Sequence, residues 1–143
     1  MKLFTILGFL LFSTAGFSQE TISWELLRDV KFAEKFNEEL GSYINVPTFG
    51  NSVKAKAGKE VQITGYVIPL DVKQNVYVLS ANPYAACFFC GGAGPETVID
   101  LKFIKAPKKY KTDERVTVKG KLKLNATDIY QLTYVLENAV QVK

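Results

Sequence analysis

Apolar and polar residues alternate regularly along the chain from Glu60 onward. Val61, Ile63 and Val67 alternate with polar neighbours, which is typical of a strand with one buried face. Four further segments are also read as strands, at 76–80, 99–103, 116–124 and 132–142. Five strands with spacing that suits antiparallel pairing predict a small closed barrel of the OB type, and a small β-sandwich is the alternative.

Gly65 interrupts the first of these strands. A glycine inside a strand usually marks a bulge or a sharp bend. We therefore expect this strand to bend at Gly65, as the first strand of a small closed barrel must.

Near the other end of the domain, Asn125-Ala126-Thr127 has the form of a glycosylation sequon but is expected to mark only a turn.

The segment 19–59 lacks the regular strand pattern, and we expect it to cap a barrel domain that spans residues 60–143. Ser23 is a suitable N-cap for a short helix over 23–28, on which Trp24 and Leu27 share a face. A lone tryptophan on such a face needs a partner surface, so Trp24 is expected to be largely buried.

The rest of this segment is harder to assign. Residues 30–40 fit an extended segment at least as well as a continuing helix, and both readings stay open. Residues 41–49 are expected to form a connector. A short helix is expected within 48–57, burying Phe49 and Val53 and ending at Gly58.

The first 18 residues have the pattern of a secretory signal peptide. Met1-Lys2 precedes an apolar run from Leu3 to Phe12, and small residues follow up to Ser18. The apolar run is too short to be a permanent membrane-spanning helix, and no later run is longer. We expect cleavage after Ser18 and a mature protein that is periplasmic or secreted.

Composition and charge narrow the class of function. The chain has 143 residues and a net charge of +4, and removal of the signal peptide leaves 17 basic against 14 acidic residues. The chain has no histidine, which excludes histidine-based triads, imidazole bases and histidine metal ligands. No carboxylate pair or activated hydroxyl stands out, so nothing points to an enzyme. The lysines at 102–111 are expected to form a solvated face, with no role in nucleic-acid binding.

Both cysteines lie in one run, Cys87-Phe88-Phe89-Cys90, which is followed by two glycines. A C-x-x-C pair can form a disulfide, bind a soft metal or exchange electrons. A disulfide across two residues closes a small loop and stabilises little. Thiol–disulfide exchange needs a low-pKa thiolate, usually at a helix N-terminus, and the glycines and Pro95 disfavour a helix here. Thiol–disulfide redox chemistry is therefore the second alternative, behind metal binding and a disulfide-locked loop.

Two thiolates suit Zn(II) or Cu(I), and glycines let the backbone approach a metal closely. Two ligands are too few for a closed zinc site, so Glu96, Asp100 or a second subunit would have to complete it. Phe88 and Phe89 are adjacent aromatic residues in a glycine-rich loop, and at least one is expected to be exposed and available to a periplasmic or membrane-protein partner. Two functions therefore remain as alternatives. The protein is either an accessory protein that binds a soft metal, or an interaction module whose loop is locked by a disulfide.

Two segments of the chain carry a resemblance to a known family. Gly65-Tyr66-Val67-Ile68-Pro69-Leu70 and Cys87-Phe88-Phe89-Cys90-Gly91-Gly92-Ala93-Gly94-Pro95-Glu96 resemble a family of uncharacterised secreted bacterial proteins of Bacteroidetes type, a domain of unknown function with an OB-like fold. The resemblance implies a compartment and a fold rather than an activity. More distant relatives carry a cysteine followed closely by a histidine, which implies that Cys90 replaces another soft ligand and favours metal binding.

Overall fold

The computed structural model describes residues 19–105 and 108–142, so the expected signal peptide lies outside the described residues. The helices and strands in chain order are β1 (Glu20–Thr21), α1 (Trp24–Leu27), β2 (Val30–Asn37), β3 (Ser42–Phe49), α2 (Asn51–Lys54), β4 (Glu60–Asp71), β5 (Val76–Ser80), β6 (Val98–Phe103), β7 (Glu114–Leu124) and β8 (Tyr134–Gln141). Three short 3-10 turns connect β5 to β6: η1 (Tyr84–Ala86), η2 (Phe88–Cys90) and η3 (Pro95–Thr97). None of the helices in these ranges has the length and apolar character needed to cross a membrane.

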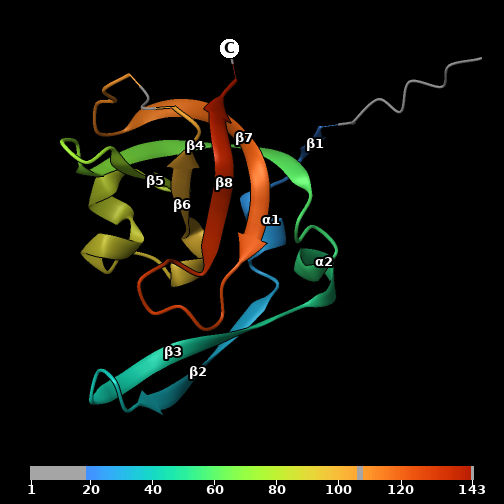
Figure 1. Cartoon of the computed structure of the whole chain (residues 1–143), viewed down its shortest axis with the longest axis vertical. Coiled ribbons are helices and arrows are strands. Elements are labelled where there is room, and N and C mark those ends of the chain that lie inside the picture. Colours follow the sequence, from blue (N-terminus) through green and yellow to red (C-terminus); the bar gives the residue numbers. More distant parts are fainter. Residues whose placement is uncertain (1–18, 106–107, 143) are drawn as a thin grey trace, which may run out of the picture.

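Five strands close into a barrel (Figure 1). Their hydrogen-bonded order is β4–β5–β6–β8–β7, and β7 pairs back onto β4. Neighbours are antiparallel except β6 and β8, which are parallel. The predicted fold class, mainly β with a five-stranded OB-like barrel, is confirmed, and all five strands lie where the alternation placed them.

Strand β4 changes partner near Gly65. Its first part, from Glu60 to Val67, pairs with β7, and its last part, from Tyr66 to Asp71, pairs with β5. A side chain at Gly65 would meet Ser80 and Trp24, because a Cβ there would lie 2.6 Å from the Ser80 carbonyl oxygen and 2.9 Å from the indole. Position 65 therefore needs glycine because the Ser80 backbone and the Trp24 indole approach it closely, and β4 also changes its partner strand near this position.

Trp24 packs over this glycine from helix α1. Its indole Nε1 donates a hydrogen bond to the Thr64 carbonyl oxygen at 2.8 Å. Ser23 caps the helix, as expected, by accepting from the Leu26 N–H. Trp24 is only half-buried, whereas Leu27 on the same helix is fully buried. The indole thus packs over Gly65 at the edge of the core, beside Leu79, while Leu27 lies fully inside the core.

Alternate residues of the strands fill two apolar layers. Tyr77, Leu79 and Ile99 belong to the main core. Their neighbours Val78 and Val98 are also buried, although they are not part of that core. Because successive strand residues point to opposite faces, these valines lie on the outside of the barrel. Figure 1 shows η1 and η2 outside the barrel, beside β5 and β6, so the connection that carries the cysteines covers this outer layer.

The segment before the barrel differs from the sequence-based expectation. Residues 30–37 and 42–49 form an antiparallel hairpin with eight paired positions, so the expected connector at 41–49 is wrong. Gly41, with φ of 61°, sits in the turn and allows the chain to reverse. The hairpin lies outside the barrel in Figure 1, and its turn reaches the β7–β8 connection, where the Tyr130 hydroxyl donates to Glu39 at 3.1 Å. With few core contacts to impose a strict apolar period, its strands gave a weak signal.

Helix α2 is shorter than expected. It spans four residues and buries Val53, as expected, but Phe49 belongs to the end of β3. Asp29 holds the start of this helix by accepting from the Ser52 N–H at 3.0 Å. Gly58 follows the helix with φ of 75°. The helix ends at Lys54, before the expected stop, and Gly58 instead adopts the left-handed backbone that favours glycine in the turn that follows.

Candidate functional site

A groove of about 240 Å³ crosses the outer face of β5 and β6. One wall is Phe89 from the cysteine loop, which we define as residues 81–97, and the other is the β7–β8 connection with Ile129, Tyr130 and Leu132. Leu70 of β4 and Val76 of β5 add to its apolar lining. OB-folds bind ligands on the face of their second and third strands, flanked by two connections. In this chain those strands are β5 and β6, so the groove lies on the face that the fold commonly uses for binding.

Three large apolar side chains are exposed around this groove. Tyr130 is 79% exposed, Leu70 49% and Phe89 40%. They come from three connections or strand ends far apart in the sequence, and they meet only because the barrel closes. A cluster of exposed apolar residues beside polar ones is a common mark of an interaction site.

The cysteine loop holds Phe89 in place through its backbone. The Cys87 N–H donates to the Tyr84 carbonyl, and the Cys87 carbonyl accepts from the N–H groups of Cys90 and Gly92 at 3.2 and 3.1 Å. Gly91 adopts φ of 73°, which ends the η2 turn. Phe88 is half-buried and stands edge-on to Phe89, with ring centroids 5.5 Å apart. The loop therefore buries part of one phenylalanine and presents the other.

The two cysteines are free thiols with different surroundings. Cys87 is fully buried and Cys90 is exposed. The pKa of Cys90 is raised, first by desolvation in the loop and then by the charge and hydrogen bond of Cys87, against a smaller opposite effect of Tyr84. A raised pKa keeps this thiol protonated at neutral pH, which is the reverse of what a reactive cysteine needs. The loop is ordered by backbone hydrogen bonds and by burial of Cys87, without a disulfide.

Glu96 does not join the cysteines. Its carboxylate folds back over Gly94, where an added Cβ would collide with it. In the two described ranges, no three histidine, cysteine, aspartate or glutamate side chains are grouped so that they could hold a metal ion. The sequence-predicted ligands Cys87, Cys90 and Glu96 are thus not brought together as one set.

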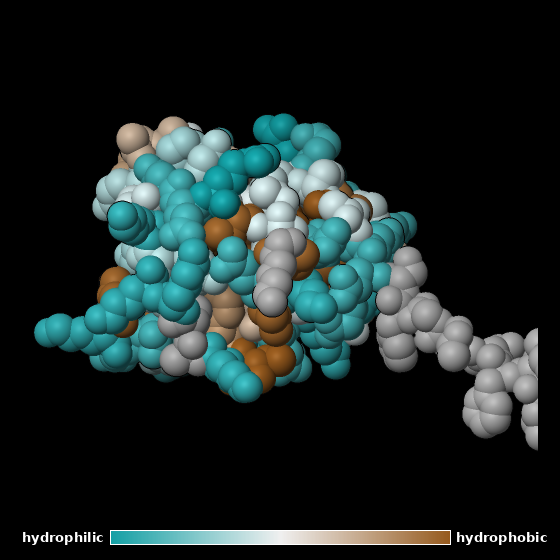
Figure 2. Space-filling view, turned by 90° about the horizontal axis from the view of Figure 1, so that it is seen from above, coloured by the Kyte–Doolittle hydropathy of each residue, from teal (hydrophilic) through white to brown (hydrophobic). Residues whose placement is uncertain are grey.

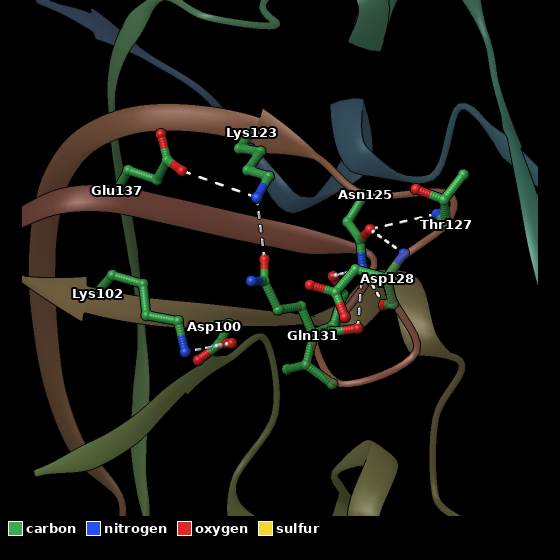
Figure 3. A network of polar contacts seen from close by, with 9 residues as sticks. Asp100, Lys102, Lys123, Asn125, Thr127, Asp128, Gln131 and Glu137 are labelled. Atoms are coloured by element: carbon green, nitrogen blue, oxygen red, sulfur yellow. Dashed lines mark hydrogen bonds and ion pairs between the residues drawn. The ribbon is translucent and has the colours of Figure 1, made fainter.

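The other half of the binding face is polar (Figure 3). Asp100, only 6% exposed, forms an ion pair with Lys102 at 2.8 Å. Lys123 of β7 donates to Gln131 at 3.2 Å and lies 3.9 Å from the carboxylate of Glu137 on β8. Asp100 and Lys102 also line the apolar groove. A ligand in the groove would therefore meet apolar side chains on one side and, on the other, the ion pair of a nearly buried aspartate with an exposed lysine.

Asn125 organises the connection that carries Tyr130. Its side-chain Nδ2 donates to the carbonyls of Asp128, Gln131 and Leu132 at 2.7, 3.0 and 3.2 Å. Its Oδ1 accepts from the N–H groups of Thr127 and Asp128. The residues that follow Asn125 do form a turn, but the sequence did not reveal that one buried asparagine holds the whole connection.

Sequence reasoning found one wall of the groove and missed the rest. It singled out Phe88 and Phe89 as candidate docking residues, took Lys102 only as part of a solvated face, and did not single out Leu70 or Tyr130. The available signal was the pair Ile129-Tyr130, two large apolar residues side by side in a connection whose other residues are mostly polar. That pair could have been recognised as a surface feature, although nothing in the sequence placed it opposite Phe89.

Comparison with known proteins agrees with the fold. A family model described as a protein of unknown function, DUF3299, matches residues 19–142. A crystal structure of a DUF3299 family protein from Pseudomonas aeruginosa PAO1 is similar with a TM-score of 0.53 and 15% identity, covering 88% of this chain and 97% of that chain. At this identity the likeness concerns the fold alone. No curated protein matches the sequence. Since the family model spans nearly the whole described chain, the protein belongs to the DUF3299 family, whose function is unknown.

Proposed function

We propose that this protein is an exported, non-catalytic accessory protein that binds a partner through the groove on the outer face of β5 and β6. The observation that carries the proposal is the convergence of Leu70, Phe89 and Tyr130, all exposed, on that groove. The signal-peptide pattern of residues 1–18 supports export to the periplasm or beyond. The partner is an apolar or aromatic segment of a periplasmic or membrane protein.

The chemistry of the groove fits a protein partner. Aromatic side chains supply a large contact area with few rotatable bonds, and they are enriched where binding energy concentrates. Phe89 is held by the ordered cysteine loop and Tyr130 by the turn around Asn125, so little order has to be gained on binding. The ion pair between Asp100 and Lys102 lies at the edge of the groove, where it would orient the polar groups of the bound partner.

The test uses site-specific photo-crosslinking in cells that express the full chain. A crosslinker at position 130 should capture a discrete partner, and the same group at Tyr43, 70% exposed on the hairpin, is the control. With the purified partner, Phe89→Ala and Tyr130→Ala should each weaken binding about ten-fold or more, whereas Tyr43→Ala should not. Equal capture from both positions, or equal effects of the three variants, would contradict the proposal.

Cys87 and Cys90 support a second candidate function, the binding of a soft metal. The two free thiols lie on one short turn and are close enough for Cys87 to raise the pKa of Cys90. Two thiolates suit Cu(I), a soft ion that accepts few ligands. Zn(II) prefers four ligands, so a zinc site would need further ligands from a partner bound near the loop.

Metal titration separates this candidate from the interaction module. Under reducing, anaerobic conditions the protein should bind one Cu(I), and Cys87→Ser and Cys90→Ser should each abolish binding. Because two thiols must lose protons, binding should tighten as the pH rises. If the double variant Cys87→Ser/Cys90→Ser binds as much Cu(I) or Zn(II) as the native protein, the cysteines serve the loop structure alone.

A further inference from the structure

A second hollow opens at the end of the barrel where β6 and β8 finish. Its volume is about 450 Å³, within the range of ~300–1,000 Å³ typical of small-molecule sites. Two aromatic rings, two exposed aliphatic side chains and two lysines dominate its lining: Phe103 and Tyr110, Ile104 and Val140, Lys105 and Lys108. Figure 2 looks onto this end and shows apolar atoms exposed among hydrophilic side chains. The hollow shares no lining residue with the groove beside the cysteine loop.

The apolar part of the hollow is exposed although it belongs to a well-packed end of the barrel. Ile104 is 61% exposed and Val140 39%. Below them the rings of Phe103 and Tyr110 stack at 6.0 Å, and both stand edge-on to Tyr77. The floor is therefore rigid and aromatic, and an aliphatic chain laid on it would gain contact without having to order the site.

Tyr77 adds a polar feature behind this floor. Its hydroxyl is the one buried side-chain polar atom without a hydrogen-bond partner among the described residues. Tyr110, by contrast, donates from its hydroxyl to Gln141 at 2.9 Å. A buried hydroxyl without a partner is unfavourable, so a water molecule or a ligand group that reached it from the hollow would be stabilised.

The rim of the hollow carries two lysines, Lys105 and Lys108, from a lysine-rich segment. Residues 101–112 contain five lysines and no acidic residue: Lys102, Lys105, Lys108, Lys109 and Lys111. Lys108 is held over the Tyr110 ring at 5.2 Å and pairs with Glu114. Lys105 is exposed beside Ile104. The positive charges at the edge complement an anionic group, while the apolar floor complements a hydrocarbon chain.

We infer that this hollow binds a single-chain anionic amphiphile of the fatty-acid type. The acyl chain lies on Phe103, Ile104 and Val140, and the carboxylate lies at the rim between Lys105 and Lys108. A concave site of this size accepts one chain, whereas a bilayer surface would need a flat or protruding patch. The inference is independent of the proposed partner groove, because the two sites have different lining and different charge.

The test is calorimetric titration of the mature protein, residues 19–143, with laurate below its critical micelle concentration. We expect saturable binding of one laurate and binding at least about ten-fold weaker for dodecyltrimethylammonium, which has the same chain length and the opposite charge. Lys105→Glu should weaken laurate binding about five-fold at low salt. Lys109→Glu makes the same change of charge outside the lining and should have a smaller effect.

A second pair of variants tests the apolar floor. Ile104→Ser should weaken laurate binding about ten-fold, and Val72→Ser, at a 37% exposed valine outside the hollow, should leave it unchanged. Should Ile104→Ser fail to fold by circular dichroism, Val140→Ser replaces it. The inference is overturned if laurate does not saturate, if both amphiphiles bind alike, if each variant matches its control, or if anionic vesicles bind while monomeric laurate does not.

Discussion

Replacing Gly65 by alanine places a methyl group at the point where β4 changes partner. The new Cβ would lie 2.6 Å from the Ser80 carbonyl oxygen and 2.9 Å from both Leu79 and the Trp24 indole. The carbonyl is part of the barrel backbone and cannot withdraw, so the indole and the leucine must move. The change therefore combines overpacking with partial loss of the contact between helix α1 and the barrel.

The magnitude follows from these contacts. Overpacking of a well-packed site costs about 1–3 kcal/mol. Withdrawal of Trp24 removes its hydrogen bond to Thr64, which contributes ~1 kcal/mol, and exposes on the order of 50 Å² of apolar surface, which contributes ~1 kcal/mol. Alanine offsets ~0.5–1 kcal/mol by restricting the unfolded chain. We expect a net loss of about 2–4 kcal/mol in the free energy of unfolding.

Urea unfolding followed by fluorescence measures this loss, because Trp24 is the single tryptophan of the chain. The native emission of Gly65→Ala should also shift to longer wavelength as the indole gains solvent. Arg115→Val, at an exposed position of β7, is the control for a side-chain change in a neighbouring strand. A loss within about 0.5 kcal/mol together with unchanged emission would refute the packing argument.

Three further predictions concern polar groups. Tyr134→Phe should cost about 1–2 kcal/mol in urea unfolding, because the buried hydroxyl donates to the Leu27 carbonyl at 2.7 Å; an unchanged midpoint would count against this. Hydrogen bonds from Ser52 lower the pKa of Asp29, so its contribution to stability is present above its ordinary pKa of 3.8 and is lost as the pH falls through the lower value of the folded state. Asp29→Asn should therefore reduce stability at pH 7 and flatten the acid limb of a stability–pH curve, and parallel curves would contradict that. Asn125→Ala should leave several backbone groups unsatisfied, cost roughly 2 kcal/mol and open the β7–β8 connection to proteolysis, whereas native-like resistance to cleavage would show that the connection orders itself.

The barrel strands could be predicted because their signal is local. Val61, Ile63 and Val67 face the core through a strict alternation, and the same period recurs in each later strand. The hairpin of β2 and β3 could not be predicted in the same way, because its residues contact the core little and alternate weakly. Gly65 was recognised as a special position, but the close approach of Trp24 became visible only in the folded chain.

The same distinction between local and tertiary information applies to the candidate site. The sequence by itself determined the cysteine run, the lack of histidine and the pairing of two aromatic residues in one loop, because these are properties of neighbouring residues. Only the tertiary structure decided that Cys87 is buried and Cys90 exposed, and that the Glu96 carboxylate lies over Gly94 and is not grouped with both cysteines. It also decided that Leu70, Phe89 and Tyr130 share one groove. The physical reason is that alternation identifies the two faces of a strand, whereas what covers the outer face depends on which distant connections the closed barrel brings together.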